Sequence, residues 1–431
     1  MKIAIAGYGV EGEENYKYWS TDSSNDITIV DGSETPSRAL PEGVKTLLGS
    51  DAFEKLNGFD IVVRTAGLAP YKITTDGTMW SATNEFFAQC PAPIIGVTGS
   101  KGKGTTSSLI TSILEAAGKK VWLVGNIGIP ALNVLAQVQP DDIVVYELSS
   151  FQLWDIKRSP HTAVVLMIEQ EHLDVHRSME EYVEAKAQIT RYQTSSDLLV
   201  YNALNEYAQF IADSSNATKI GYPSEAAAHV RDGMFYYGPQ IICSTSELRI
   251  PGAHNIDNAM AAIDAIWQYV QDPEIIKTGL NNFKGLPHRL AYVDTVNGVE
   301  YYDDSIATTP GSAIASLRAF PNRSKVIILG GSYKGSDFSE LGNELTRHEV
   351  KVLLIGDEGP AIAKAADEAG FSNYEFIENP TTEKFTRRAA ELSVEGGVVL
   401  LSPASASFGL YKNYVDRGEQ FIAAVEKLKT T

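Results

Sequence analysis

Short β-branched segments alternate with helical segments along most of the chain, and this pattern constrains the fold more than any other feature. Examples are KIAIA at residues 2–6, IIGVT at 94–98 and KVIILGG at 325–331, each followed by a turn and a helical stretch. Strands that alternate with helices in this way form parallel sheets joined by crossover helices. The sequence therefore predicts an α/β fold built from several such units.

Two proline-containing breaks divide this pattern. The CPAP stretch at residues 90–93 resists both helix and central strand, and GLPHRL interrupts the alternation near residue 288. A chain of 431 residues is also too long for one ordinary hydrophobic core. We therefore expect three domains, at residues 1–92, 93–288 and 289–431.

Charge and composition exclude several classes of protein. The net charge of −18 would repel a nucleic acid or an anionic membrane surface. No apolar run approaches the length of a membrane span. The two cysteines, Cys90 and Cys243, lack the spacing of a metal site, and so few cysteines suit a reducing compartment. We expect a soluble cytoplasmic protein.

The first predicted domain carries a nucleotide-type glycine pattern. Gly7, Gly9 and Gly12 fit G-x-G-x-x-G between a strand and a helix, and Asp31 ends the next strand. Such glycines let backbone N–H groups approach a phosphate at a helix N-terminus. The pattern alone is weak, because many strand–turn–helix corners use glycine only for turning.

The second domain opens with GVTGSKGKGTT at residues 96–106. The standard G-x-x-x-x-G-K-[ST] loop would need glycine in place of Val97, and Ser or Thr in place of Gly104. A strand nevertheless enters the loop and a helix leaves it, which favours a phosphate cradle. Lys103 would meet the β- and γ-phosphates, and the hydroxyl of Thr105 or Thr106 could reach Mg²⁺.

Acidic side chains follow two further predicted strands of this domain. Glu147 ends one of them, where parallel sheets present ligands. The segment MIEQEHLDVH at residues 167–176 adds Glu169, Glu171, His172, Asp174 and His176. Mg²⁺ prefers oxygen ligands, so the carboxylates are the easier assignment. From composition and spacing alone, Lys186 would be a solvated helix lysine.

Taken together, the motifs resemble the Mur ligase family. They include GVTGSKGKGTT, GNIGIPAL, YELSSFQL, EQEHLDVH, YVEAKAQI, GAHNIDNAMAA, FKGLPHRL, YYDDSIATTPGSA, LGGSYKGSDF and LLSPASASFGLYKNYVDRGEQF, which run in the family's order across nearly the whole chain. The resemblance implies a Rossmann-like N-terminal domain, a central P-loop ATPase-like parallel sheet and a Rossmann-like C-terminal domain. It also implies an ATP-dependent ligase of peptidoglycan synthesis that joins D-glutamate to UDP-N-acetylmuramoyl-L-alanine through an acyl phosphate, as a monomer.

The resemblance also assigns roles to residues. It implies that Lys103, Glu147, His172 and Lys186 are catalytic, and that two Mg²⁺ ions are held by Thr105, Glu147, His172 and a carbamylated Lys186. The implied ATP contacts are Gly99, Ser100, Lys101, Gly102, Lys103, Gly104, Thr105, Thr106, Asn255, Asn258, Arg289 and Asp304. The implied UDP-substrate contacts are Gly7, Gly9, Gly12, Asp31 and Asn126. The implied amino-acid contacts are Thr308, Lys334, Ser407 and Tyr414.

The chain departs from the family pattern at three positions. The usual D-S-K-A-T-N segment reads DSIATT, so Ile306 replaces a lysine and Thr309 an asparagine. Losing a cation beside an anionic substrate could remove a charge-assisted hydrogen bond worth about 1.5–3 kcal/mol. Gly104 directly after Lys103 leaves the magnesium hydroxyl open between Thr105 and Thr106. The accepted amino acid therefore stays open at this point.

Other functions explain the same sequence less well. A folylpolyglutamate-type ligase would take another acceptor, but that branch normally begins directly with the ATPase domain. A catalytically silent scaffold would be expected to have a damaged ATP site, yet Lys103, Glu147, His172 and Lys186 are all present. A nucleotide dehydrogenase would not need the phosphate loop. The ligase interpretation is the one we carry forward.

Overall fold

Parallel sheets organise the chain, as the alternating pattern predicted. The structure is a computed structural model that describes residues 1–126, 129–172, 175–333 and 335–429. Its internal contacts divide the chain into two compact units, Met1–Glu247 with Asp257–Leu280, and Leu248–Ile256 with Asn281–Thr431. Three larger sheets fall one to each predicted domain, while the exact domain boundaries stay a prediction.

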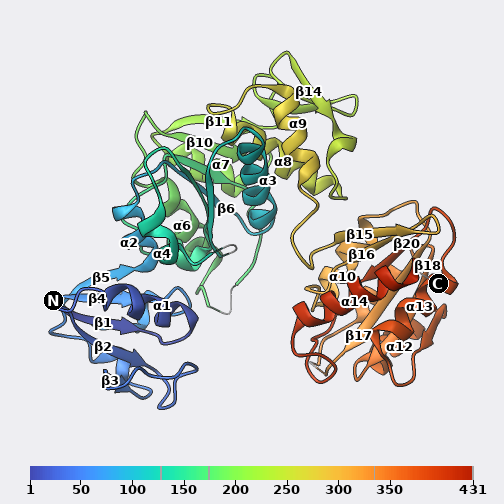
Figure 1. The fold of residues 1–431 in the computed structure, drawn as a ribbon, viewed down its shortest axis with the longest axis horizontal. Coiled ribbons are helices and arrows are strands. Elements are labelled where there is room, and N and C mark those ends of the chain that lie inside the picture. The colour runs from blue at the N-terminus through green and yellow to red at the C-terminus, as the bar shows by residue number, and fades with distance from the viewer. Residues whose placement is uncertain (127–128, 173–174, 334, 430–431) are drawn as a thin grey trace. The chain divides into compact units, whose positions relative to one another are not determined.

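The N-terminal sheet has the strand order β3-β2-β1-β4-β5 and is parallel throughout. Its strands are β1 (Lys2–Ala6), β2 (Asp26–Asp31), β3 (Lys45–Leu48), β4 (Ile61–Arg64) and β5 (Thr78–Ser81), with helices α1 (Val10–Trp19) and α2 (Ala82–Gln89) and short 3₁₀ turns η1 (Ala52–Glu54) and η2 (Pro70–Lys72). The central strand β1 is buried from Ile3 to Ala6 because both faces of a parallel sheet are covered. This is the expected Rossmann-like arrangement (Figure 1).

The middle sheet is also parallel, in the order β11-β10-β9-β6-β8-β7. Its strands are β6 (Ile94–Thr98), β7 (Val121–Gly125), β8 (Ile143–Glu147), β9 (Thr162–Val165), β10 (Leu198–Asn202) and β11 (Thr218–Tyr222). Its helical segments are α3 (Lys103–Ala116), α4 (Ala131–Val134), η3 (Leu135–Gln137), α5 (Ser150–Leu153), α6 (Met179–Ala187), η4 (Gln188–Thr190) and α7 (Glu206–Ser214). Strands β6, β8 and β9 lie side by side, so the loops after them meet at one edge.

A small antiparallel sheet follows, which the sequence analysis did not predict. It has the order β12-β13-β14, formed by β12 (Ala228–Arg231), β13 (Met234–Tyr237) and β14 (Gln240–Ser244). The first turn contains Asp232 and Gly233, both at positive φ, and Asp-Gly is a strong hairpin signal. After η5 (Thr245–Glu247) come the helices α8 (Ala253–Ile266) and α9 (Pro273–Asn282).

The C-terminal sheet has the order β15-β16-β20-β17-β18-β19. Its strands are β15 (Ala291–Val296), β16 (Val299–Asp303), β17 (Lys325–Gly331), β18 (Val350–Gly356), β19 (Tyr374–Phe376) and β20 (Val398–Leu401), and its helices are α10 (Pro310–Arg318), α11 (Ser339–Leu345), α12 (Gly359–Glu368), α13 (Thr382–Leu392) and α14 (Tyr414–Leu428). Only the β15–β16 hairpin is antiparallel among these pairs.

The short connection between α11 and β18 carries charged side chains. Helix α11 ends at Leu345 and β18 begins at Val350. The side chains of Arg347 and His348 both contact Glu344 near the end of that helix. None of the helices in the described ranges is both long enough and apolar enough to cross a bilayer.

Substitution by alanine is expected to change the free energy of unfolding in opposite directions at two helical glycines. Alanine favours a helix over glycine by about 1 kcal/mol. A Cβ at Gly311 in α10 would meet nothing within 4 Å, whereas a Cβ at Gly279 in α9 would lie 2.4 Å from the Ile113 Cα of α3. We predict that Gly279→Ala lowers the free energy of unfolding by about 1–3 kcal/mol through overpacking. Gly311→Ala should hold or raise it. Urea unfolding of both variants tests this, and equal shifts would contradict it.

Candidate active site

The loop between β6 and α3 forms a cradle of backbone at a helix N-terminus. Gly99 has φ +155° and Gly102, which caps α3, has φ +87°, conformations that suit glycine. A Cβ at Gly102 would lie only 2.3 Å from the Asn258 Oδ1. The first N–H groups of a helix lack intrahelical partners and attract anions. The loop therefore has backbone geometry that suits an anion, and its binding of phosphate stays a prediction.

Two lysines converge on one carbonyl of this loop. The Lys103 Nζ donates to the Gly99 carbonyl at 2.9 Å and to the Ser100 carbonyl at 2.7 Å. The Lys186 Nζ donates to the same Gly99 carbonyl at 2.7 Å. Lys186 is only 1% exposed, so the expectation of a solvated helix lysine, which came from composition alone, was wrong. Residues far apart in the sequence, on α3 and α6, meet here.

Burial changes the chemistry of Lys186. Desolvation lowers the pKa of its ammonium well below the usual range, and the nearby Lys103 charge lowers it further. The carboxylates of Glu171 and Glu147 oppose this shift. A lysine with a lowered pKa holds more of the neutral amine, which is the nucleophilic form.

Ser100 and Tyr182 fasten the segment after β9 to the loop. The Ser100 Oγ donates to the Glu169 carbonyl at 2.9 Å and accepts the Glu169 N–H at 3.0 Å. The Tyr182 hydroxyl lies 2.9 Å from the same Oγ and 3.4 Å from the Glu171 Oε2. Tyr182 was not singled out from the sequence, although it lies one helical turn before Lys186 on α6. On the outer side of the loop, Lys101 pairs with Glu169.

Glu147 presents a buried carboxylate at the end of β8. Its Oε1 accepts the Asn126 Nδ2–H at 3.0 Å. Its Oε2 is buried and finds no hydrogen-bond partner within the described part of the chain. An orphaned buried carboxylate oxygen is costly, and it is a natural cation ligand. The residue is 2% exposed, so this oxygen fits a bound metal ion better than solvent.

The two histidines of residues 167–176 have different surroundings. His172 has φ +57°, a largely exposed side chain, and an Nε2 that lies 3.8 Å from the Glu171 Oε2. His176 is buried, hydrogen-bonded to the Ser150 Oγ at 2.9 Å and packed against Phe151 and Trp154. His172 is therefore accessible to solvent and its role as a ligand stays a prediction, while His176 is buried and bonded to Ser150.

No preformed cluster of three His, Cys, Asp or Glu side chains that could hold a metal occurs among residues 1–126, 129–172, 175–333 and 335–429. The predicted metal-ligand set of Thr105, Glu147, His172 and Lys186 includes a hydroxyl and an amine. The absence of a cluster made of His, Cys, Asp or Glu within these described ranges therefore does not test this set. Asp174, which the sequence also offered, lies outside the described residues.

The two candidate threonines differ in what they already bind. The Thr106 hydroxyl is fully buried and donates to the Asn258 Oδ1 at 3.3 Å. The Thr105 hydroxyl is half-buried and meets no partner in the portion of the chain that the structure describes. Asn258 is therefore tied to the loop, and Asn255 donates to the Pro251 carbonyl at 2.6 Å. Gly104, between the lysine and the threonines, is buried.

A cavity of about 480 Å³ lies beside Asn126 in the same unit. Its lining includes Glu11 and Glu14 of α1, the Ala66–Gly67 turn, and Ser149, Phe151 and Gln152 around α5. Burial raises the pKa of the Glu11 carboxyl, and the Ala66 N–H and the Arg64 charge oppose that rise. These residues were not singled out from the sequence, although the Ala66–Gly67 turn follows β4 and Ser149 caps α5.

The glycine pattern of β1 and α1 adjoins this cavity without lining it. A Cβ at Gly7 would lie 2.2 Å from the Thr65 Oγ1, and one at Gly12 would lie 2.1 Å from the Gly7 carbonyl oxygen. Gly9 caps α1, and the Asp31 carboxylate accepts the Tyr8 and Ser33 N–H groups at 2.7 and 2.9 Å. Close packing explains Gly7 and Gly12, whereas a Cβ at Gly9 would meet, among the described residues, only the Ser37 Oγ at 3.9 Å. The contact of these glycines with a nucleotide stays a prediction.

The C-terminal unit holds the remaining predicted ATP contacts. Arg289 is exposed. The Asp304 carboxylate is buried and accepts hydrogen bonds from the Leu290 N–H at 3.0 Å, the Ser402 Oγ at 2.7 Å and the Ser316 Oγ. Burial raises the pKa of Asp304 to about 6. The Asp304 oxygens already accept three hydrogen bonds from within the unit. A contact with ATP would therefore have to share these oxygens with those donors.

The predicted amino-acid contacts follow β16 and β20. Thr308 is half-buried, Ser407 is buried, and Tyr414 is exposed at the start of α14, where its carbonyl accepts from the Ser305 Oγ at 2.7 Å. Lys334 lies outside the described residues. Of the two family departures in the DSIATT segment, Ile306 is half-buried. Thr309 caps α10 through the Ser312 N–H, a role that Thr and Asn share.

Comparisons with known proteins agree on one family. Residues 97–266 match the Mur ligase middle domain and residues 288–405 the Mur ligase glutamate ligase domain. The chain is similar to the UDP-N-acetylmuramoylalanine–D-glutamate ligase of Streptococcus thermophilus, at 35% identity over 419 residues that cover 94% of this chain and 92% of the relative. The enzyme of that name from Acetivibrio thermocellus is 36% identical over 455 residues, covering 99% and 97%.

A solved structure with a similar fold is the UDP-N-acetylmuramate-alanine ligase MurC of Thermotoga maritima. The match has a TM-score of 0.61 and 18% sequence identity, and it covers 99% of each chain. At this identity the likeness concerns the fold alone. It supports the multi-domain α/β architecture predicted from the sequence.

Substitutions at Thr105 and Thr106 are expected to have different effects on the free energy of unfolding, measured without nucleotide. Thr106→Val removes a buried hydrogen bond to Asn258 and should lower the free energy of unfolding by about 1 kcal/mol. Thr105→Val removes no protein contact and should change it by less than about 0.5 kcal/mol. Urea unfolding of the two isosteric variants checks this. A larger loss at position 105 than at 106 would reverse the assignment.

Proposed function

The chain belongs to the Mur ligase family, and from that premise we propose which residues carry its reaction. It is an ATP-dependent, ADP-forming amide-bond ligase of peptidoglycan synthesis. It joins D-glutamate to UDP-N-acetylmuramoyl-L-alanine, the reaction for which its relatives are named. The observation that carries the site assignment is the convergence of Lys103 and Lys186 on the Gly99 carbonyl of the phosphate loop.

The chemistry requires activation of a carboxylate. The terminal carboxylate of the sugar-peptide is a poor electrophile, so its oxygen attacks the γ-phosphorus of ATP and releases ADP. The resulting acyl phosphate is then attacked by the amine of D-glutamate, which loses a proton and displaces inorganic phosphate. Most of the enzyme's contribution is positioning and neutralisation of negative charge.

We assign the ATP phosphates to the loop Gly99–Thr106. The N-terminus of α3 supplies unpaired N–H groups, and Lys103 supplies a positive charge beside them. The Lys103 ammonium donates hydrogen bonds to two backbone carbonyls of the loop. To bind a phosphate it would have to replace these acceptors by phosphate oxygens. Asn255 and Asn258 are assigned to the adenine, and Arg289 and Asp304 to the phosphates and ribose.

We assign the metal ligands to Thr105, Glu147, His172 and Lys186, with two Mg²⁺ ions. The partnerless buried Oε2 of Glu147 and the partnerless hydroxyl of Thr105, each judged over the described residues, support this set. Mg²⁺ supplies charge stabilisation of the phosphate oxygens when bound. Lys186 would contribute as a carbamate: its neutral amine adds CO₂ and releases a proton, which leaves an anionic oxygen ligand.

The cavity beside Asn126 is the proposed place of the UDP-sugar peptide, with Gly7, Gly9, Gly12 and Asp31 at its nucleotide end. Thr308, Lys334, Ser407 and Tyr414 are assigned to D-glutamate. Ile306 supplies no charge, so Lys334 is the cation that we assign to a glutamate carboxylate. We further propose a monomeric enzyme of the cytoplasm, where its nucleotide substrates are made.

The function is tested by phosphate release from ATP with UDP-N-acetylmuramoyl-L-alanine and, in parallel, D-glutamate, L-glutamate or other amino acids. We expect turnover with D-glutamate alone. Turnover with another amino acid would support the ligase reaction but change its amino-acid substrate. Ile306 would then be the first residue to test as the cause. Silence with every amino acid would contradict the proposed reaction.

The role of Lys186 is tested by substitution. Lys186→Ala should reduce turnover below detection, because the carbamate oxygen is lost, and added short-chain carboxylates should restore part of it. Lys119→Ala, which removes an exposed lysine just beyond the end of α3, should retain full turnover. Full activity of Lys186→Ala would remove this lysine from the mechanism.

A further inference from the structure

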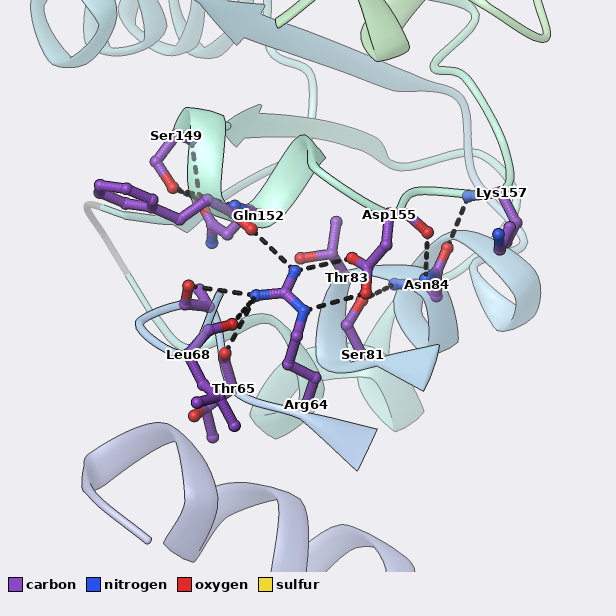
Figure 2. A network of polar contacts seen from close by, with 12 residues as sticks. Arg64, Thr65, Leu68, Ser81, Thr83, Asn84, Ser149, Gln152, Asp155 and Lys157 are labelled. Carbon is purple, nitrogen blue, oxygen red and sulfur yellow. Dashed lines mark hydrogen bonds and ion pairs between the residues drawn. The ribbon is translucent and has the colours of Figure 1, made fainter. Parts of the chain in front are cut away.

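Arg64 is a fully buried arginine at the end of β4. It contacts the turn that directly follows it and also Phe151 and Asp155, which lie 87 and 91 residues further along the chain. All three guanidinium nitrogens donate hydrogen bonds. Figure 2 shows the group between Asp155 on one side and the turn after β4 on the other. The N–H donors of a guanidinium point in fixed directions within one plane. A guanidinium whose three nitrogens are all hydrogen-bonded is therefore held in one orientation.

On one side, Arg64 gathers the carbonyls of the turn that follows β4. Its Nη1 donates to the carbonyls of Thr65, Ala66 and Leu68 at 3.1, 3.2 and 2.8 Å. Three carbonyls that converge on one nitrogen fix the path of the turn. The same turn donates the Ala66 N–H to the Glu11 Oε2 at 2.8 Å, which ties it to α1.

On the other side, Arg64 holds the segment that contains α5. Its Nε and Nη2 form a bidentate pair with the Asp155 carboxylate at 2.9 and 2.7 Å, and Nη2 also donates to the Phe151 carbonyl at 2.9 Å. Bidentate Arg–carboxylate pairs fix orientation as well as distance. Asn84 holds the Asp155 carbonyl from behind through its Nδ2 at 3.1 Å.

Both of these segments line one cavity. Ala66 and Gly67 line the ≈ 480 Å³ cavity from the turn, and Ser149, Phe151 and Gln152 line it from the α5 segment. Arg64 itself is not in the lining. Its hydrogen bonds therefore fix the positions of two lining segments relative to each other.

A buried ion pair is a weak source of net stability, because desolvation of both charges offsets their attraction. Specific geometry is the better reason for such a pair. A lysine would carry the charge but could not donate in a plane to Asp155, Phe151 and the three turn carbonyls at once.

We propose that Arg64, with Asp155, is a positioning pair that sets the width of the sugar-nucleotide cavity and thereby the affinity for UDP-N-acetylmuramoyl-L-alanine. The inference rests on the proposed function of this cavity. Neither side chain touches the reacting atoms, so both act through Ala66, Gly67 and the α5 segment. Binding of ATP to the phosphate loop is independent of this pair.

The test compares Arg64→Lys and Asp155→Asn with wild type in the phosphate-release assay, titrating the sugar nucleotide and ATP separately. Both variants should raise KM for the sugar nucleotide by about tenfold or more, while kcat and KM for ATP stay within about twofold. Gln193→Leu is the matched control. Gln193 is a buried side chain that bonds the Pro160 and Leu198 carbonyls, and it lies outside the cavity lining.

Thermal unfolding and calorimetric titration of the sugar nucleotide accompany the kinetics. A merely structural pair would lower the unfolding temperature of Arg64→Lys and Asp155→Asn, as in Gln193→Leu, and leave KM and Kd for the sugar nucleotide unchanged. That result would overturn the proposal. If Arg64→Lys fails to fold, Asp155→Asn decides alone, because it keeps the shape of the side chain while it removes the charge and one of the two carboxylate acceptors that Arg64 uses. Wild type that turns over no sugar nucleotide would instead contradict the proposed function.

Discussion

One backbone carbonyl, that of Gly99, organises the candidate catalytic centre. It accepts hydrogen bonds from both Lys103 and Lys186, which come from different helices. Gly99 can turn its carbonyl this way because it has φ +155°, and a Cβ there would lie 2.7 Å from the Leu166 Cβ. Burial lowers the pKa of Lys186, and the nearby charge of Lys103 lowers it further. The loop geometry that brings the two lysines together therefore contributes to this shift.

A single side chain also joins separate segments at the cavity that Asn126 lines. There the Arg64 guanidinium joins a turn of the N-terminal sheet to a segment of the middle sheet, and both line the cavity. In each case a buried basic side chain donates to backbone carbonyls, which need no change of charge to accept hydrogen bonds. A backbone acceptor has a fixed position, so it orients a long side chain more tightly than a mobile surface carboxylate would.

Glu147 illustrates incomplete hydrogen bonding at the candidate site. Its Oε2 is buried without a partner within the residues that the structure describes. Elsewhere comparable groups are satisfied, as the Thr106 hydroxyl is by Asn258 and the Asp304 carboxylate by Leu290 and Ser402. Unsatisfied groups next to satisfied ones mark where a ligand would complete the network.

The sequence by itself determined the α/β class and the position of the phosphate loop, because strand–helix alternation and glycine turns are local patterns. It also determined where β6 and β8 end. Lys103 lies beyond the loop that follows β6, and Glu147 is the last residue of β8. It did not determine the antiparallel sheet β12–β14, although the Asp232–Gly233 turn carried a signal for it. Only the tertiary structure decided that Lys186 is buried and that Arg64 meets Asp155. These facts depend on contacts between segments far apart in the chain, for which composition and spacing carry no signal.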